Sequence, residues 1–151
     1  MHNRSAMEVY EDLSAKGLYE QANLDKEEVQ KVLNMTWEDY EFAKRTKQDR
    51  KPSWRVIFNA YYDVFRELCD QLMRFKKQKT SNHQGLFAFI VLQFKELDLN
   101  WELLEQMRTL RNNNKYRAVD ISEKMWKSVE LSFELYISAV RKAIEQKLRE
   151  V

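Results

Sequence analysis

The chain has 151 residues, and its 26 lysines and arginines exceed its 24 aspartates and glutamates by a net charge of +2. This excess is too small to indicate nucleic-acid binding over the whole surface. The length suits one domain, residues 1–151, with a core that needs no disulfide or metal. Two glycines and one proline leave little material for tight hairpins, whereas helix-forming residues are frequent. The composition therefore predicts a single all-α domain.

The one cysteine, Cys69, cannot form a disulfide within the chain, which suits a reducing compartment. No stretch approaches the run of about 18 apolar residues that a membrane span needs. Residues 1–4 lead into charged sequence rather than into the apolar core of a signal peptide. We therefore expect a cytoplasmic protein with no membrane partner.

Two helices are predicted before the proline. Residues 6–16 form a short amphipathic pattern that stops at Gly17, a residue suited to a helix C-terminus. A longer pattern covers residues 25–47, where apolar side chains recur at helical spacing. We assign residues 1–24 to an N-terminal extension with a short helix and residues 25–149 to the main bundle.

The second long helix is predicted over residues 53–75, because Pro52 disfavours helix in the preceding residue and Ser53 can cap a helix that starts after it. Its apolar residues recur every three or four positions, and further apolar residues extend the stripe beyond one face of the helix. We therefore expect neighbours on several sides. The aromatic surplus predicts, in addition, a surface that a second copy of the chain covers. The residues behind that prediction are Trp54, Phe58, Phe87 and Phe94.

The second half of the chain predicts three further helices. A polar connection at residues 78–85 precedes a very apolar helix ending near Leu97, and a turn at residues 98–100 precedes a helix that starts at Trp101. The last helix begins at a cap, Asp120 or Ser122, and runs almost to the end of the chain. Short connections between long helices predict an antiparallel up-and-down bundle of four to five main helices, with the short N-terminal helix added to it.

Residues 104–117 are the densest polar cluster beside an apolar helical pattern. The candidate nucleic-acid-binding residues are Arg108, Arg111, Lys115 and Arg117. We expect Arg111 and Asn112 at the rim of a concave basic surface. The structural alternative is that the asparagines end a helix and that Arg111 pairs with a carboxylate of a neighbouring helix.

The residues for several other chemistries are missing. The two histidines are His2, in the N-terminal tail, and His83, and Cys69 cannot complete a zinc site with them. Gly17 and Gly85 cannot build a phosphate-binding loop, and no Glu-x-x-His pair indicates a di-metal bundle. We therefore expect no metal and no cofactor.

Three segments together resemble HEPN (higher eukaryote and prokaryote nucleotide-binding) domains. They are Asn-Ala-Tyr-Tyr-Asp-Val-Phe-Arg at 59–66, Thr-Ser-Asn-His-Gln-Gly-Leu at 80–86, and Leu-Arg-Asn at 110–112 followed by Tyr116. The resemblance implies a bundle of four or five helices that dimerises and brings two Arg-Asn segments into one cleft. Many relatives are metal-independent ribonucleases of toxin–antitoxin systems, with a minimal nucleotidyltransferase as the antitoxin.

The chain departs from the family's catalytic motif, in which an arginine is followed after four to six residues by a histidine. Arg111 and Asn112 match, but Tyr116 fills the first possible histidine position, and Ala118 stands where some relatives carry a tyrosine. An imidazole exchanges protons near neutral pH, whereas a phenol with a pKa near 10 does so poorly. The candidate catalytic set is Arg111, Asn112 and Tyr116, and we expect weak or absent cleavage with phosphate or RNA binding retained. His83 matches a different family position, where we expect it to cap a helix.

Three functions remain open from the sequence. The first is an RNA-binding protein or metal-independent endoribonuclease of a toxin–antitoxin type, acting as a homodimer. The second is a non-catalytic HEPN module that dimerises or binds a partner, and the third is an unrelated helical scaffold.

Overall fold

Helices dominate the computed structural model, which describes residues 3–150, so that His2 lies outside the described residues. In chain order the elements are α1 (Ala6–Ala15), β1 (Glu20–Gln21), α2 (Lys26–Thr46), α3 (Trp54–Arg74), β2 (Gln78–Lys79), α4 (His83–Gln93), the 3-10 turn η1 (Lys95–Leu97), α5 (Trp101–Tyr116) and α6 (Glu123–Arg149). The predicted all-α class is confirmed.

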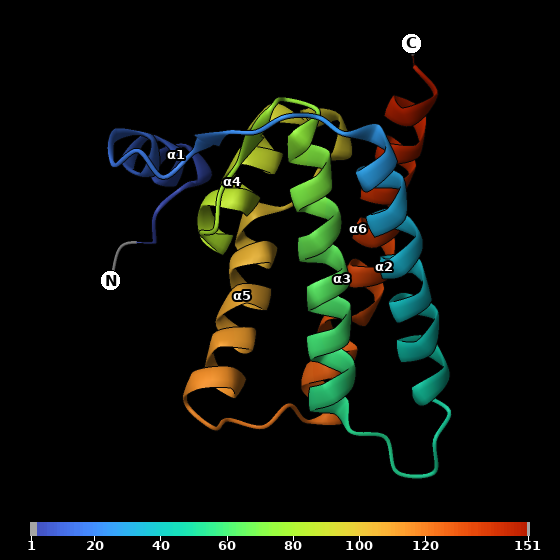
Figure 1. Ribbon diagram of the computed structural model, residues 1–151. Coiled ribbons are helices and arrows are strands. Elements are labelled where there is room, and N and C mark those ends of the chain that lie inside the picture. Colours follow the sequence, from blue (N-terminus) through green and yellow to red (C-terminus); the bar gives the residue numbers. More distant parts are fainter. Residues whose placement is uncertain (1–2, 151) are drawn as a thin grey trace.

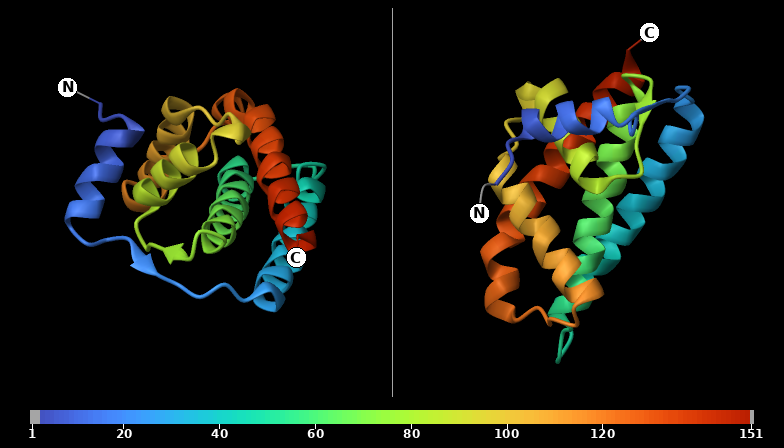
Figure 2. Two further views of the ribbon diagram at one scale, coloured as in Figure 1. Left: turned by 90° about the horizontal axis from the view of Figure 1, so that it is seen from above. Right: turned by 90° about the vertical axis from the view of Figure 1, so that its left-hand side faces the viewer.

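The long helices form an up-and-down bundle. Figure 1 shows α2 and α5 running in one direction and α3 and α6 in the other. The shorter α4 lies near one end of the bundle, where it contacts both α3 and α5. α1 packs on α4 and lies outside the bundle proper, as the view from above shows (Figure 2). The predicted antiparallel bundle with an extra N-terminal helix is therefore the observed one.

Side-chain caps fix where the helices begin. Ser53 caps α3 as the sequence predicts, and of the two caps predicted for the last helix it is Ser122 that begins α6. Asp25 caps α2, and Asn100 caps α5. Each cap oxygen accepts a hydrogen bond from a backbone N–H that the first helical turn cannot satisfy. Asn82 caps α4 through the N–H of Gly85 at 2.8 Å. α4 consequently begins at His83, three residues before its expected start at Leu86.

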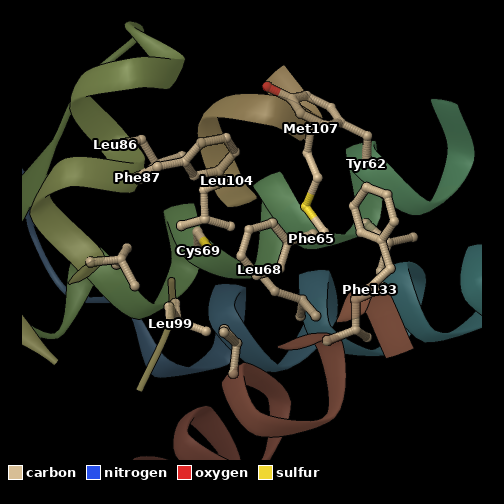
Figure 3. Packing of buried hydrophobic residues seen from close by; sticks show 14 of the residues in the cluster. Tyr62, Phe65, Leu68, Cys69, Leu86, Phe87, Leu99, Leu104, Met107 and Phe133 are labelled. Atoms are coloured by element: carbon tan, nitrogen blue, oxygen red, sulfur yellow. The ribbon is translucent and has the colours of Figure 1, made fainter. Parts of the chain in front are cut away.

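α3 is the central element of the core. Its neighbours are α2 and α6 on one side and α4 and α5 on the other. Figure 3 shows side chains of α3 packed with those of α4, α5 and α6; its labelled residues are Tyr62, Phe65, Leu68, Cys69, Leu86, Phe87, Leu99, Leu104, Met107 and Phe133. Burying a side chain of this size stabilises the fold by about 1.5–3 kcal/mol, so this seam contributes much of the folding free energy.

The predicted use of the aromatic surplus is wrong. Phe58, Phe87 and Phe94 are no more than 2% exposed within the monomer, and Trp54 is half-buried beneath the ammonium group of Lys127. The excess exists because α3 and α4 are enclosed by neighbours of the same chain. These residues therefore give no ground for a dimer interface.

A partly buried ionic cluster connects the residue after α2 to α6. The ammonium nitrogen of Lys47 lies 2.8 Å from a carboxylate oxygen of Glu130 and 3.1 Å from one of Glu134. The indole N–H of Trp126 donates to the same Glu130 oxygen at 3.2 Å. Because each charge has a close partner, the cost of removing these groups from water is offset by their mutual attraction.

The N-terminal extension is fastened at several points. β1 pairs antiparallel with β2, with Glu20 opposite Lys79. Strands of two residues are too short to show an alternating pattern, so the sequence did not predict them. The Tyr19 hydroxyl donates to the Gly85 carbonyl oxygen at 2.7 Å, and the Trp101 indole N–H donates to the Arg4 carbonyl oxygen at 2.9 Å. These contacts place the extension against the start of α4 and the start of α5. No helix within residues 3–150 is long and apolar enough to cross a membrane.

The Leu13 side chain of α1 lies close to the backbone of α4 at Gly85, and this contact can be tested. A Cβ atom at this position would lie 2.5 Å from Cδ1 of Leu13 and 3.3 Å from the Tyr19 hydroxyl oxygen. We expect Gly85→Ala to lower the free energy of unfolding by about 1–3 kcal/mol through overpacking, and to increase amide hydrogen exchange in α1. Urea denaturation and exchange measured by mass spectrometry check both effects.

The added variant Leu13→Ala removes the atom that the new methyl group meets. The double variant should therefore lose less stability than the sum of the two single variants. Simple additivity would show that the contact at Gly85 does not position α1.

Candidate functional site

A groove lies between the start of α4 and the second half of α5. Its volume is about 340 Å³, and its lining residues are Ser81, Asn82, His83, Gln84, Arg108, Asn112 and Tyr116. Arg108, Asn112 and Tyr116 of the candidate set thus share one surface, spaced by four residues along one face of α5. His83 and Gln84 join them from α4. The start of α4 also turns the positive end of its helix dipole toward the groove.

Tyr116 is the most exposed apolar ring at this groove. Its exposed fraction is 83%, at the last helical position of α5. The phenol is therefore largely surrounded by solvent. The ring is free to lie against a flat ligand.

Arg111 turns away from the groove and into the seam between α3 and α5. Its Nη2 lies 3.0 Å from Oδ1 of Asp63, and its side chain is 13% exposed. The guanidinium carbon lies 5.4 Å from the ring centroid of Tyr62, and Nη1 is buried with no hydrogen-bond partner among the described residues. This is the structural alternative of the sequence analysis, because the basic rim expected around Arg111 is replaced by an ion pair within the monomer.

The three asparagines have separate positions and partners. Asn112 lines the groove. The carbonyl oxygen of Asn113 accepts the N–H groups of Arg117 and Val119 and so ends α5. Asn114 accepts a 3.1 Å hydrogen bond from Nδ2 of Asn59 on α3. Asn112 is therefore the asparagine that a ligand in this groove would meet.

Arg108 is held by a network that starts in the N-terminal extension. Its Nε and Nη2 donate to the two carboxylate oxygens of Glu105, at 3.0 and 3.1 Å. Gln84 donates to Glu105 at 2.9 Å, and Arg4 donates to Gln84 at 3.1 Å. The network fixes the orientation of the Arg108 guanidinium at the groove and also neutralises part of its charge.

His83 is the site residue that the sequence analysis missed, because its expected role as a cap belongs to Asn82. Nδ1 of His83 lies 3.5 Å from the hydroxyl oxygen of Tyr62, at the outer limit of a hydrogen bond. Tyr62 is fully buried and reaches from α3 toward α5 (Figure 3). The Arg111 guanidinium lies over the ring of Tyr62. Tyr62 therefore contacts both Arg111, the site residue expected from the sequence, and His83.

A second groove adjoins the first, and His83 lies between them. It has a volume of about 300 Å³, and its lining residues are Glu20, Arg66, Asp70, Arg74, Lys79, Thr80, Ser81, His83 and Leu86. Arg74 pairs with Asp70 at 3.1 Å, and Arg66 lies 3.5 Å from a carboxylate oxygen of Glu67. An imidazole exposed to solvent therefore has an arginine in the groove on either side, Arg66 and Arg108.

The surroundings favour the neutral form of His83. The partial burial of the imidazole lowers its pKa below the ordinary value, and the positive charges of Arg66 and Arg111 lower it further, whereas Asp63 opposes the shift. Burial raises the pKa of the Tyr62 phenol, so this hydroxyl keeps its proton. At neutral pH the site thus presents a neutral imidazole among cationic guanidinium groups.

The remaining candidates lie apart from this arrangement. Lys115 and Arg117 are exposed at the end of α5 and do not line either groove at His83. Cys69 is buried in the core, where desolvation raises the pKa of its thiol well above the ordinary value. Residues 3–150 contain no group of three or more histidine, cysteine, aspartate or glutamate side chains arranged to hold a metal ion.

The Arg111–Asp63 pair predicts unequal costs for its two members. Asp63→Ala leaves a largely buried guanidinium without a partner, so we expect the free energy of unfolding to fall by about 1–2 kcal/mol. Arg111→Met keeps much of the packing and leaves a carboxylate that is 43% exposed and open to water, so its cost should stay below about 1 kcal/mol. Urea denaturation of both variants measures the difference.

The double variant Asp63→Ala/Arg111→Met should recover part of the loss caused by Asp63→Ala alone. Equal costs for the two single variants would mean that Arg111 is not confined to the seam in solution.

No protein-family model matches this chain, and no curated protein and no solved structure matches it. The resemblance to HEPN domains therefore rests on residues 59–66, 80–86 and 110–116, and it remains a prediction. The grooves around His83 are accordingly the structural basis for assigning a function.

Proposed function

We propose that this chain is a HEPN-type protein that binds single-stranded RNA in the groove between α4 and α5. The observation that carries the proposal is the convergence of Arg108, Asn112 and Tyr116 with His83 in one groove. These side chains offer a cation, an amide, an aromatic ring and an imidazole, the groups that RNA-binding sites use for phosphates and bases.

Phosphate binding is assigned to Arg108 with Asn112 beside it. The Glu105 pair uses Nε and Nη2 of Arg108, and no hydrogen bond of Nη1 is found among the described residues. A phosphate oxygen can therefore add to Nη1 without breaking the network. The positive end of the α4 dipole favours an anion at the same place.

Base binding is assigned to Tyr116. A ring that is 83% exposed beside a polar groove offers its face to an unpaired base. Stacking of this kind requires a base that is not enclosed in a duplex, which favours single-stranded RNA.

The resemblance brings further proposals. A second copy of the chain and a minimal nucleotidyltransferase antitoxin are proposed partners, and the cytoplasm is the proposed location. Because the surplus aromatic residues pack within the monomer, the homodimer is supported by the resemblance alone. Lys115 and Arg117, exposed next to Tyr116, are proposed to contact the RNA where it leaves the groove.

A non-catalytic module that binds a protein partner is the second candidate. Its supporting observation is Arg111, which pairs with Asp63 of its own chain rather than facing the groove. Exposed apolar side chains elsewhere, Met35 and Phe42 on α2 and Leu131 and Leu135 on α6, would then serve a protein interface. Under this candidate no RNA binds at low salt.

Arg108 is tested by its effect on RNA affinity and on the salt dependence of binding. Arg108→Gln should weaken binding of a labelled single-stranded RNA about fivefold to tenfold, because a charge-assisted phosphate contact is lost. The slope of log affinity against log salt should become shallower by about 0.7, the change expected for one phosphate contact with a single strand. Fluorescence anisotropy at several salt concentrations measures both quantities.

Arg149→Gln is the matched control, since Arg149 is exposed at the far end of α6. It makes the same change of charge outside the groove and should leave affinity and slope near those of the unaltered protein. If both variants behave alike, RNA is held by general charge and the groove is not the site.

Two variants of Tyr116 distinguish stacking on its ring from a role of its hydroxyl group. Tyr116→Ala should cost about 1–3 kcal/mol of RNA binding free energy, the range for one stacked base. Tyr116→Phe keeps the ring and should bind within about twofold of the unaltered protein. Anisotropy titrations at one salt concentration suffice, and a loss in Tyr116→Phe as large as in Tyr116→Ala would contradict the stacking role.

A further inference from the structure

A cavity between α2 and α6 lies away from the groove at His83. Its volume is about 410 Å³, within the range of small-molecule sites, and its walls include Trp37, Lys44, Arg141 and Lys142. We propose that this cavity binds a small phosphate monoester, with the Arg141 guanidinium as its main contact. The proposal goes beyond the RNA binding proposed above and does not depend on it.

The central helix α3 separates this cavity from the RNA groove. Figures 1 and 2 show α2 and α5 on opposite sides of α3. The groove is lined from α4, from α5 and from the two residues before α4, whereas the cavity is lined from α2 and α6. A ligand in the cavity would therefore leave the groove open for RNA.

Arg141 is held in place before a ligand arrives. Its guanidinium carbon lies 3.5 Å from the ring centroid of Trp37, so the guanidinium stacks on the indole. Its Nε lies 3.0 Å from a carboxylate oxygen of Glu145, an ion pair that does not have the geometry of a hydrogen bond. An arginine positioned by stacking loses little conformational freedom when it binds an anion.

The N–H groups of Arg141 have no acceptor. No hydrogen bond of its guanidinium is found among the described residues, although the side chain is only 30% exposed and its Nε is buried. Donors that have lost part of their water gain from a new acceptor. The planar fork of the guanidinium matches two oxygens of a phosphate group, which can accept two parallel hydrogen bonds.

The net charge of the cavity favours a dianion. Lys44, Arg141 and Lys142 bring three positive charges, and Glu145 brings one negative charge, which leaves +2. Within the part of the chain that the structure describes, neither lysine forms an ion pair, and the Lys44 ammonium lies 5.3 Å from the ring centroid of Tyr40. A phosphate monoester carries about −1.5 to −2 at pH 7, so it balances this charge better than a carboxylate or a phosphodiester with one negative charge.

Two aromatic rings give the cavity a wall for the organic part of the ester. The ring centroids of Trp37 and Tyr40 lie 5.2 Å apart. Burial raises the pKa of Tyr40 to about 12, so this phenol stays neutral and does not repel an anion. The cavity is much larger than one phosphate ion, which favours a phosphate that carries a compact organic group.

Isothermal titration calorimetry of the full-length chain with phenyl phosphate tests the site. The unaltered protein should bind one equivalent, and phenyl sulfate, which has a similar shape and one charge fewer, should bind at least about fivefold more weakly. Arg141→Gln should weaken the binding of phenyl phosphate at least about tenfold, because hydrogen bonds between charged groups are lost. Arg141→Lys should recover only part of the affinity, since it restores the charge without the fork.

Two lysine variants provide the matched comparison. Lys142→Gln removes a charge from the cavity wall and should weaken binding about threefold. Lys31→Gln makes the same change at an exposed position of α2 outside the cavity and should bind like the unaltered protein. In NMR spectra, the indole N–H signal of Trp37 should shift as phenyl phosphate is added.

Each outcome decides the proposal. No binding of phenyl phosphate at millimolar concentration, or undiminished binding by Arg141→Gln, overturns the site, and equal affinity for phenyl sulfate overturns the assignment of a dianion. Thermal denaturation shows whether Arg141→Gln is folded, and Lys142→Gln, altered at an exposed position, gives a reading that does not rely on that variant. Displacement of labelled RNA by phenyl phosphate would place the ester in the other groove and overturn the proposal. Absence of RNA binding would overturn the proposed function alone.

Discussion

The structure depends on the burial of most of α3 between four neighbouring helices. Its successive residues Tyr61 and Tyr62 are both fully buried, although they point to different sides of the helix. Tyr61 packs edge-on against Trp126 of α6 with ring centroids 4.7 Å apart, while Tyr62 packs against Phe87 of α4 at 5.9 Å. A helix that buries side chains on several faces needs several neighbours, and α2, α4, α5 and α6 provide them. The core and the candidate site are consequently built on adjacent residues of one rigid element.

This enclosure explains why the fold could be predicted from the sequence and why its surface could not. Helical spacing and caps such as Ser53 and Ser122 depend on neighbours within a few residues, so they are visible in the chain itself. Whether Phe58 and Phe87 face a second copy or another helix depends on where α4 and α6 lie, which spacing does not contain. The predicted dimer surface failed for this reason, since an apolar excess has the same pattern in both cases.

The candidate site was predictable only in part. Arg108, Asn112 and Tyr116 lie four residues apart on one helix, so their shared surface follows from helical geometry. Arg111 lies between them in sequence but faces α3, where Asp63 is 48 positions away along the chain. The contact of His83 with Tyr62 likewise joins two helices across 21 positions. Such contacts are products of tertiary packing, and a histidine next to Asn82 carries no local sign of them.

The electrostatics of the grooves favour short-range recognition over long-range attraction. Three arginines near the grooves form ion pairs: Arg108 with Glu105, Arg74 with Asp70 and Arg111 with Asp63. Most of the local positive charge is therefore balanced within the chain. With a net charge of only +2, the field that would draw a polyanion from a distance is weak and is screened within about 8 Å at physiological salt. A ligand held here must therefore be recognised by contact, through guanidinium hydrogen bonds and through stacking on Tyr116.

Duplexes present a regular array of phosphates and hide their bases, whereas an unpaired strand can bend to place one phosphate and one base at a time. For the RNA binding proposed above, the paired arginines thus favour a flexible single strand, because it is the form of RNA best able to use contacts instead of charge.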